Sequence, residues 1–177
     1  MNDQTLKKIA SALVFAADKH RNHRRKDIGQ TPYINHPIDL IDVLLNEADV
    51  TDTDVLIAAI LHDTVEDTDT CFEEIEQAFG THVSKMVREV TDNKRLRKEK
   101  RKQLQIEHAA GASHGAKLIK LADKICNLRD MVAAPPAGWD LERRREYFDW
   151  CLAVVDQMRG THPTLEKIFD EVYAEKP

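Results

Sequence analysis

The spacing of the apolar side chains is the feature that most constrains how this chain can fold. Segment after segment places them three or four residues apart, as on one face of an α-helix, and none alternates with period two for long enough to suggest a strand. The sequence therefore predicts an all-α fold. In the first expected helix, the apolar side chains at helical spacing are Leu6, Ile9, Ala10, Leu13, Val14 and Ala17. The expected helices span residues 5–20, 33–45, 55–61, 72–79, 82–91, 116–132, 140–159 and 164–173.

Length and composition indicate one domain and argue against several classes of protein. The chain has 177 residues, enough to bury a core without disulfides or a structural metal, so residues 1–177 are expected to form a single domain. A formal net charge of −5 argues against a general nucleic-acid or membrane-surface role. Cys71, Cys126 and Cys151 form no CxxC pattern and are expected to be small core or near-core residues without a redox role. Residues 1–8 are polar and no apolar run has membrane-spanning length, so a cytoplasmic protein is expected.

Residues 61–68, Leu-His-Asp-Thr-Val-Glu-Asp-Thr, hold the densest group of metal-ligating and acidic side chains. The preceding apolar run, residues 55–61, predicts a helix. If that helix continues, four-residue spacing places His62 beside Glu66 and Asp63 beside Asp67. Three crowded carboxylates repel one another, and a bound divalent cation would offset that repulsion. Taken alone, the motif is also compatible with a solvated, acidic helix end.

Two further side chains elsewhere in the chain could complete a metal site. His36 precedes Pro37 at the start of an expected helix, and Asp123 lies mid-helix beside an apolar stripe. Together with His62 and Asp63 they supply two imidazoles and two carboxylates. Such a set can coordinate a divalent transition metal and leave positions open for water and substrate. Nitrogen and oxygen ligands without thiolate favour manganese, iron, nickel or zinc at a catalytic site.

This combination resembles the HD superfamily of metal-dependent phosphohydrolases, named for the adjacent histidine and aspartate. More narrowly, the sequence is similar to the hydrolase domain of the RelA/SpoT alarmone enzymes. The motifs that carry this similarity are Arg25-Lys26, Tyr33-Ile34-Asn35-His36-Pro37, residues 61–68, Phe79-Gly80, Val90-Thr91-Asp92 and Lys117-Leu118-Ile119-Lys120-Leu121-Ala122-Asp123-Lys124. Similarity to the stand-alone, animal-type SpoT homologues, the small alarmone hydrolases, rests on the long loop between Arg25 and His36, Asn127-Leu128-Arg129-Asp130, Gly138-Trp139 and Glu146-Tyr147-Phe148. The resemblance covers about residues 10–158 and implies a helical HD domain.

The resemblance implies a hydrolase that uses one manganese ion. The implied metal ligands are His36, His62, Asp63 and Asp123. Glu66 and Asp67 match a Glu-Asp pair that family members place next to the attacking water. The implied reaction is hydrolysis of the 3′-diphosphate of guanosine tetra- and pentaphosphate, which yields GDP or GTP and pyrophosphate.

The implied partner is a small nucleotide, with neither nucleic acid nor a membrane involved, and the oligomeric state is left open. By resemblance, the substrate contacts are Arg25 as a base-stacking arginine, Lys26 beside it, Asn127 as a nucleoside contact, Arg143 and Tyr147. Lys98, in the basic stretch 94–102, is a candidate for binding phosphate, with a solvated surface as the alternative. The long bifunctional enzymes usually have threonine where this chain has Asp130, so no phosphate contact is expected there.

Two alternative functions remain compatible with the sequence. A site that holds a purine nucleotide and cleaves a ribose phosphate ester could instead remove the 2′-phosphate of NADPH, an activity that the animal-type resemblance also implies. A non-catalytic nucleotide sensor on the same fold is expected to lack a metal ligand or the Glu66-Asp67 pair, whereas all six residues are present. A purely structural helical bundle is disfavoured because Asp123 beside a core stripe would be costly to bury without a partner.

Overall fold

The computed structural model describes residues 3–177, and its regular structure is helical, as predicted. Within these residues the only β pairing is an isolated bridge between Arg24 and Pro32. No helix among them is both long and apolar enough to cross a lipid bilayer. The helices are α1 (Asp3–Lys19), α2 (Asn35–Asp42), the short π-helix η1 (Val43–Glu47), α3 (Thr53–Leu61), α4 (Thr64–Asp67), α5 (Phe72–Phe79), α6 (Thr81–Val90), α7 (Lys98–Ala109), α8 (His114–Ala133), α9 (Leu141–Asp156) and α10 (Pro163–Tyr173).

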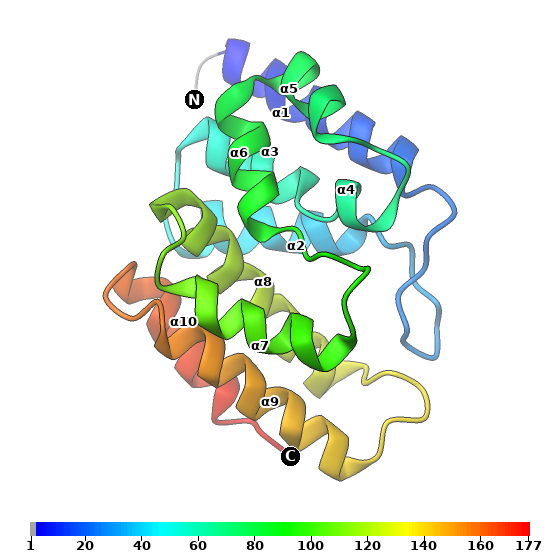
Figure 1. The fold of residues 1–177 in the computed structure, drawn as a ribbon, viewed down its shortest axis with the longest axis vertical. Coiled ribbons are helices and arrows are strands. Elements are labelled where there is room, and N and C mark those ends of the chain that lie inside the picture. The colour runs from blue at the N-terminus through cyan, green and yellow to red at the C-terminus, as the bar shows by residue number, and fades with distance from the viewer. Residues whose placement is uncertain (1–2) are drawn as a thin grey trace.

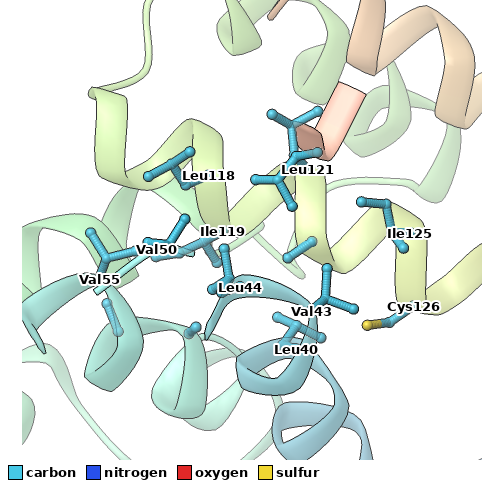
Figure 2. Packing of buried hydrophobic residues seen from close by; sticks show 14 of the residues in the cluster. Leu40, Val43, Leu44, Val50, Val55, Leu118, Ile119, Leu121, Ile125 and Cys126 are labelled. Carbon is cyan, nitrogen blue, oxygen red and sulfur yellow. The ribbon is translucent and has the colours of Figure 1, made fainter. Parts of the chain in front are cut away.

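Helix α8 is the central element of the fold. Figure 1 shows α1, α3, α5 and α6 toward one end of the molecule and α7, α9 and α10 toward the other, and α8 contacts α3 and α6 as well as α9 and α10. Figure 2 shows Leu118, Ile119 and Leu121 of α8 packed with Leu40 and Leu44 of the α2–η1 segment. A helix that is buried on nearly every side is typical of a core helix rather than a surface helix.

Side-chain caps fix where the core helices begin. Asp52 accepts hydrogen bonds from the backbone N–H groups of Asp54 and Val55 at the start of α3. Ser113 accepts one from Ala116 at the start of α8. These caps satisfy N–H groups that have no partner within the helix, typically worth about 1 kcal/mol each. Helices α3 and α8, two of the three that carry the site, therefore have defined starting points.

The helix that ends at Leu61, as expected, does not continue unbroken through residues 62–68. Helix α3 ends at Leu61, and α4 begins only at Thr64. The hydroxyl of Thr64 donates to the carbonyl of Leu61 and so satisfies a backbone acceptor at the end of α3. His62 and Asp63 occupy the break between the two helices.

Burial differs from the sequence pattern in two places. Leu6 and Val14 are 52% and 70% exposed, whereas Leu13 packs against the core as expected, and Ala12 and Ala16 are the fully buried residues of α1. Small side chains allow two helices to approach closely, whereas apolar spacing alone did not distinguish between the two faces of α1. Cys71 is exposed at the start of α5, whereas the other two cysteines are buried as expected.

Candidate active site

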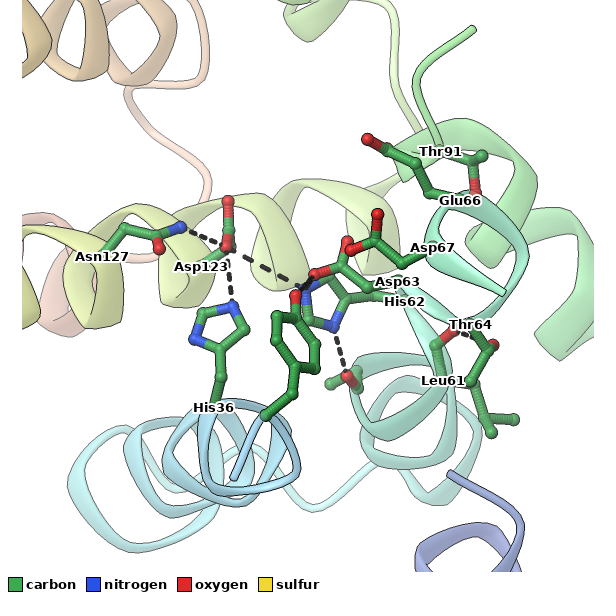
Figure 3. A network of polar contacts seen from close by, with 12 residues as sticks. His36, Leu61, His62, Asp63, Thr64, Glu66, Asp67, Thr91, Asp123 and Asn127 are labelled. Atoms are coloured by element: carbon green, nitrogen blue, oxygen red, sulfur yellow. Dashed lines mark hydrogen bonds and ion pairs between the residues drawn. The ribbon is translucent and has the colours of Figure 1, made fainter. Parts of the chain in front are cut away.

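Three helices bring two histidines and one aspartate together. His36 lies in the first turn of α2, His62 directly follows α3, and Asp123 is in the middle of α8. One ligand atom from each of them lies within 4.8 Å of the others. The His36 Nε2 atom is 3.2 Å and the His62 Nε2 atom is 4.0 Å from Asp123 Oδ1. Dashed lines mark both contacts in Figure 3.

The orientation of His62 is set by the backbone of α3. Its Nδ1 lies 2.8 Å from the carbonyl oxygen of Ala59, a contact that requires the proton on Nδ1. In the neutral imidazole, the lone pair then lies on Nε2. This nitrogen is buried, accepts no hydrogen bond, and faces the carboxylates of Asp63 and Asp123. A lone pair that faces two carboxylates is unfavourable unless a cation or a proton lies between them.

Asp63 lies at the edge of this group. Its Oδ2 is 3.0 Å from His62 Nε2, and it also accepts a hydrogen bond from the hydroxyl of Tyr33. Burial alone would raise the pKa of Asp63, but the charges and hydrogen bond of the neighbouring histidines hold it well below its usual range. Burial would likewise lower the pKa of His62, but Asp63 and Asp123 raise it to about 9. The carboxylates are thus ionised, and the cluster attracts positive charge.

The donor set fits a divalent metal ion. His36, His62 and Asp123 offer two imidazole nitrogens and one carboxylate oxygen in a buried group, with Asp63 next to it. Asp63 and Asp123 are partly buried, and the His62 Nε2 atom between them has no donor facing it, so a bound cation would be stabilised here. The set has the nitrogen and oxygen chemistry of catalytic manganese, iron, nickel or zinc sites. These observations support the expected metal ligands without distinguishing among those ions.

The two predicted catalytic carboxylates lie in different surroundings. Glu66 lines the cavity beside His36, His62 and Asp123, which we call the metal group. It accepts a hydrogen bond of 2.8 Å from the backbone N–H of Asp92. Burial raises the pKa of Glu66 to about 7, with Asp63 among the charges that add to the shift. Asp67 does not line this cavity and forms an ion pair with Lys94 instead.

The metal group opens into a cavity of about 180 Å³, which we call the catalytic cavity. Of the predicted substrate contacts, Arg25, Asn127 and Tyr147 line it, whereas Lys26 is exposed and lies outside it. The complete lining is Arg25, Tyr33, His36, His62, Asp63, Glu66, Val90, Asp92, Gln105, Ile119, Lys120, Asp123, Lys124, Asn127, Tyr147 and Trp150.

Asp130 has a structural role beside this cavity. It forms an ion pair with Arg25, whose guanidinium also lies 3.4 Å from the Asn127 side-chain oxygen. The Asn127 amide in turn donates to Asp123 at 2.6 Å. This chain of contacts positions Arg25 and Asn127 on the same side of Asp123.

A second cavity of about 400 Å³ adjoins the first. Lys98, Arg143 and Tyr147 all line it, and Tyr147 belongs to both cavities. The Arg143 guanidinium lies over the ring of Trp139 at 4.1 Å, and the Lys98 ammonium lies 5.6 Å from the same ring. The predicted substrate contacts other than Lys26 thus divide between two neighbouring cavities.

Sequence reasoning gave no role to two buried lysines of α8. Lys120 and Lys124 both line the catalytic cavity and are only 7% and 4% exposed. Lys124 lies 2.9 Å from Asp123 and 4.5 Å from the ring of Trp150. Their four-residue spacing placed them on one face, but only the packing shows that this face is buried.

The comparisons with known proteins agree with this fold. Residues 12–149 match the family model for the HD domain, and the chain belongs to this family. It is 53% identical to a Drosophila melanogaster protein and 51% identical to a human one, each named guanosine-3′,5′-bis(diphosphate) 3′-pyrophosphohydrolase MESH1. The alignments cover 96% and 95% of this chain and 94% of each relative.

A solved structure supports the same assignment. It is described as a metazoan orthologue of SpoT that hydrolyses ppGpp and plays a role in starvation responses. It matches this fold with a TM-score of 0.92 and 54% sequence identity, over 95% of this chain and 94% of that one. The resemblance to stand-alone SpoT homologues and the predicted HD-domain fold are both confirmed.

Proposed function

We propose that this protein is a manganese-dependent hydrolase that cleaves the 3′-diphosphate from guanosine tetra- and pentaphosphate and releases GDP or GTP with pyrophosphate. The observation that carries the proposal is the convergence of His36, His62 and Asp123 in a cavity that Glu66 and Asn127 also line. Relatives more than half identical to this chain are named for this hydrolysis. The substrate is then a small nucleotide, and we expect the reaction to take place in the cytoplasm.

His36, His62 and Asp123 would hold the metal ion, with Asp63 as a fourth candidate ligand beside them. When bound, a divalent ion there would lower the pKa of water and offset the negative charge of the phosphate. The Ala59 carbonyl holds the His62 ring in the tautomer that a ligand requires, and Asn127 orients the Asp123 carboxylate.

The proposed reaction forms one bond and breaks one. The oxygen of a water molecule bonds to the phosphorus that carries the ribose 3′ oxygen, and the bond between that phosphorus and the 3′ oxygen breaks. The 3′ oxygen keeps the electron pair and takes up a proton. Glu66 is suited to accept the proton of the water because it lines the cavity and its pKa of about 7 is close to the working pH.

The remaining predicted contacts suit the nucleotide. Arg25 presents a planar guanidinium next to Asn127, where a purine could stack. Lys98 and Arg143 are cations of the adjoining cavity, which Tyr147 connects to the first, so they are placed to bind phosphates beyond the reacting group. Lys26 is exposed and could contact only a part of the nucleotide that extends out of the catalytic cavity.

The test is hydrolysis of guanosine tetraphosphate by metal-stripped protein, with and without added manganese, followed by anion-exchange analysis of the products. We expect GDP and intact pyrophosphate to be released only when manganese is added. Dephosphorylation of NADPH without turnover of guanosine tetraphosphate would assign the site to the alternative substrate. Binding of either nucleotide without any turnover would indicate a sensor.

A further inference from the structure

Lys120 is a buried cation without a close partner. It is 7% exposed, and it lines the catalytic cavity from the middle of α8. Among residues 3–177, none forms a hydrogen bond or an ion pair with its ammonium group. Asp92, Asp123 and Glu66 act on it only through longer-range electrostatic attraction.

Lys124, one helical turn further along α8, provides the comparison. It is buried to a similar degree, but its ammonium lies 2.9 Å from Asp123 and over the ring of Trp150. A buried charge is costly unless a counter-charge and hydrogen bonds compensate it. Lys124 meets this condition within the protein, whereas Lys120 does not, so an anion bound in the catalytic cavity would supply the counter-charge that Lys120 lacks.

The positions along α8 indicate which part of a ligand Lys120 would meet. Asn127, Asp123 and Lys120 all line the catalytic cavity from this one helix. With a rise of about 1.5 Å per residue, the seven residues from Lys120 to Asn127 span roughly 10 Å, with Asp123 between them. If the nucleoside lies at Asn127 and the reacting phosphorus near Asp123, Lys120 lies beside the part of the ligand beyond that phosphorus.

We propose that Lys120 binds the terminal phosphate of the 3′-diphosphate, the phosphate that does not carry the ribose oxygen. The inference rests on the proposed function and identifies the residue that distinguishes a diphosphate ester from a monophosphate ester. An ammonium group donates hydrogen bonds to phosphate oxygens, and the terminal phosphate supplies the counter-charge that Lys120 lacks. A monophosphate ester has no group at this position and leaves Lys120 unpaired.

The experiment compares Lys120→Met with Lys117→Met, the same substitution one turn earlier on α8 at a lysine that lines neither cavity. Binding of inorganic pyrophosphate and of orthophosphate to manganese-loaded protein, freed of excess ion, is measured by titration calorimetry. We expect Lys120→Met to weaken pyrophosphate binding roughly 10- to 100-fold, the usual effect of losing a hydrogen bond between charged groups, and to change orthophosphate binding much less. Lys120→Arg should restore part of the pyrophosphate affinity because it retains the charge.

Thermal unfolding of the metal-free variants separates this function from a structural one. Lys120→Met should unfold at the same or a higher temperature than Lys117→Met, because the substitution removes an unpaired buried charge. Unchanged pyrophosphate binding in Lys120→Met, or a clearly lower unfolding temperature, would overturn the inference. If wild-type protein binds pyrophosphate through Lys120 but does not hydrolyse guanosine tetraphosphate, the proposed function fails while the phosphate site stands.

Discussion

Glu66 and Asp67 are adjacent in the sequence, yet their side chains lie in different surroundings. Glu66 lines the catalytic cavity, only 16% of its side chain is exposed, and Arg101 and Lys94 lie 3.6 Å and 4.0 Å from its Oε1. Asp67 is more exposed and is neutralised by Lys94. A proton acceptor has to line the cavity and have a pKa near the working pH, and Glu66 meets both conditions. The sequence left open which of the two residues transfers the proton, and the surroundings favour Glu66.

Activity should therefore depend on the protonation of Glu66. Its pKa is raised to about 7, so the carboxylate form that accepts a proton increases as pH rises through 7 and is lost as pH falls below it. We expect the turnover number of wild-type protein to fall on the acidic side of pH 7. Glu66→Gln should lower turnover by roughly 100-fold or more, the size of a typical acid–base contribution, and should remove this acidic limb. Initial rates measured between about pH 5.5 and 8.5 check both expectations.

Asp67→Asn is the matched control for that measurement. It removes the neighbouring carboxylate, which pairs with Lys94 outside the catalytic cavity. We expect a smaller loss of turnover and an acidic limb that remains in place. If Asp67→Asn were instead the more damaging change, Asp67 rather than Glu66 would be the proton acceptor.

At the scale of elements, the site depends on how closely α8 approaches α3 and α6. Gly115 lies in the first turn of α8, and a Cβ atom at this position would lie 2.4 Å from Met86 Sδ and 3.1 Å from Val55 Cγ2. The absence of a side chain thus permits the contact of three helices. The same α8 then carries Asp123 and Asn127 to the metal group.

Gly115→Ala should consequently destabilise the fold despite the higher helix propensity of alanine. Overpacking in a closely packed core typically costs about 1–3 kcal/mol. We expect a decrease of that size in the free energy of unfolding, measured by urea denaturation. Gly111→Ala is the control because its added Cβ would meet only the His108 carbonyl oxygen, at 3.8 Å. An equal loss of stability in both variants would argue against a packing origin.

At the scale of the whole molecule, the metal group connects segments that are distant in the sequence. His36, His62 and Asp123 come from α2, the end of α3, and α8. An ion bound to all three binds the native arrangement and not the unfolded chain. It should therefore add to the stability of the fold as a whole.

Removal of the metal should lower the unfolding temperature, and manganese should restore it in a concentration-dependent way. At a free ion concentration about 100 times the dissociation constant, the expected stabilisation is about 2.7 kcal/mol. His36→Gln should lose this response in a thermal unfolding assay with and without manganese. His82→Gln, the same change at an exposed histidine, should keep it. A full manganese response in His36→Gln would remove His36 from the ligand set.

Much of the fold and the candidate site was predictable from sequence because the relevant signals are local. The amphipathic spacing of residues 72–79 predicted α5 with the bounds that the structure has. His36, His62 and Asp123 were recognisable from the motifs around them, and the structure brings these three together. Apolar periodicity and short motifs report on the segment that contains them, which is why they succeeded there.

Only the tertiary structure decided which side chains meet and which remain unpaired. It broke the helix at His62 and Asp63, buried Ala12 and Ala16 of α1 rather than its larger apolar side chains, and separated the surroundings of Glu66 and Asp67. It also left Lys120 without a partner inside the core. The sequence by itself determined most of the helices, although not α7, together with the family and most of the reactive side chains. Burial and pairing depend on contacts between distant segments, which a local pattern does not contain, so they were decided by the packing around α8.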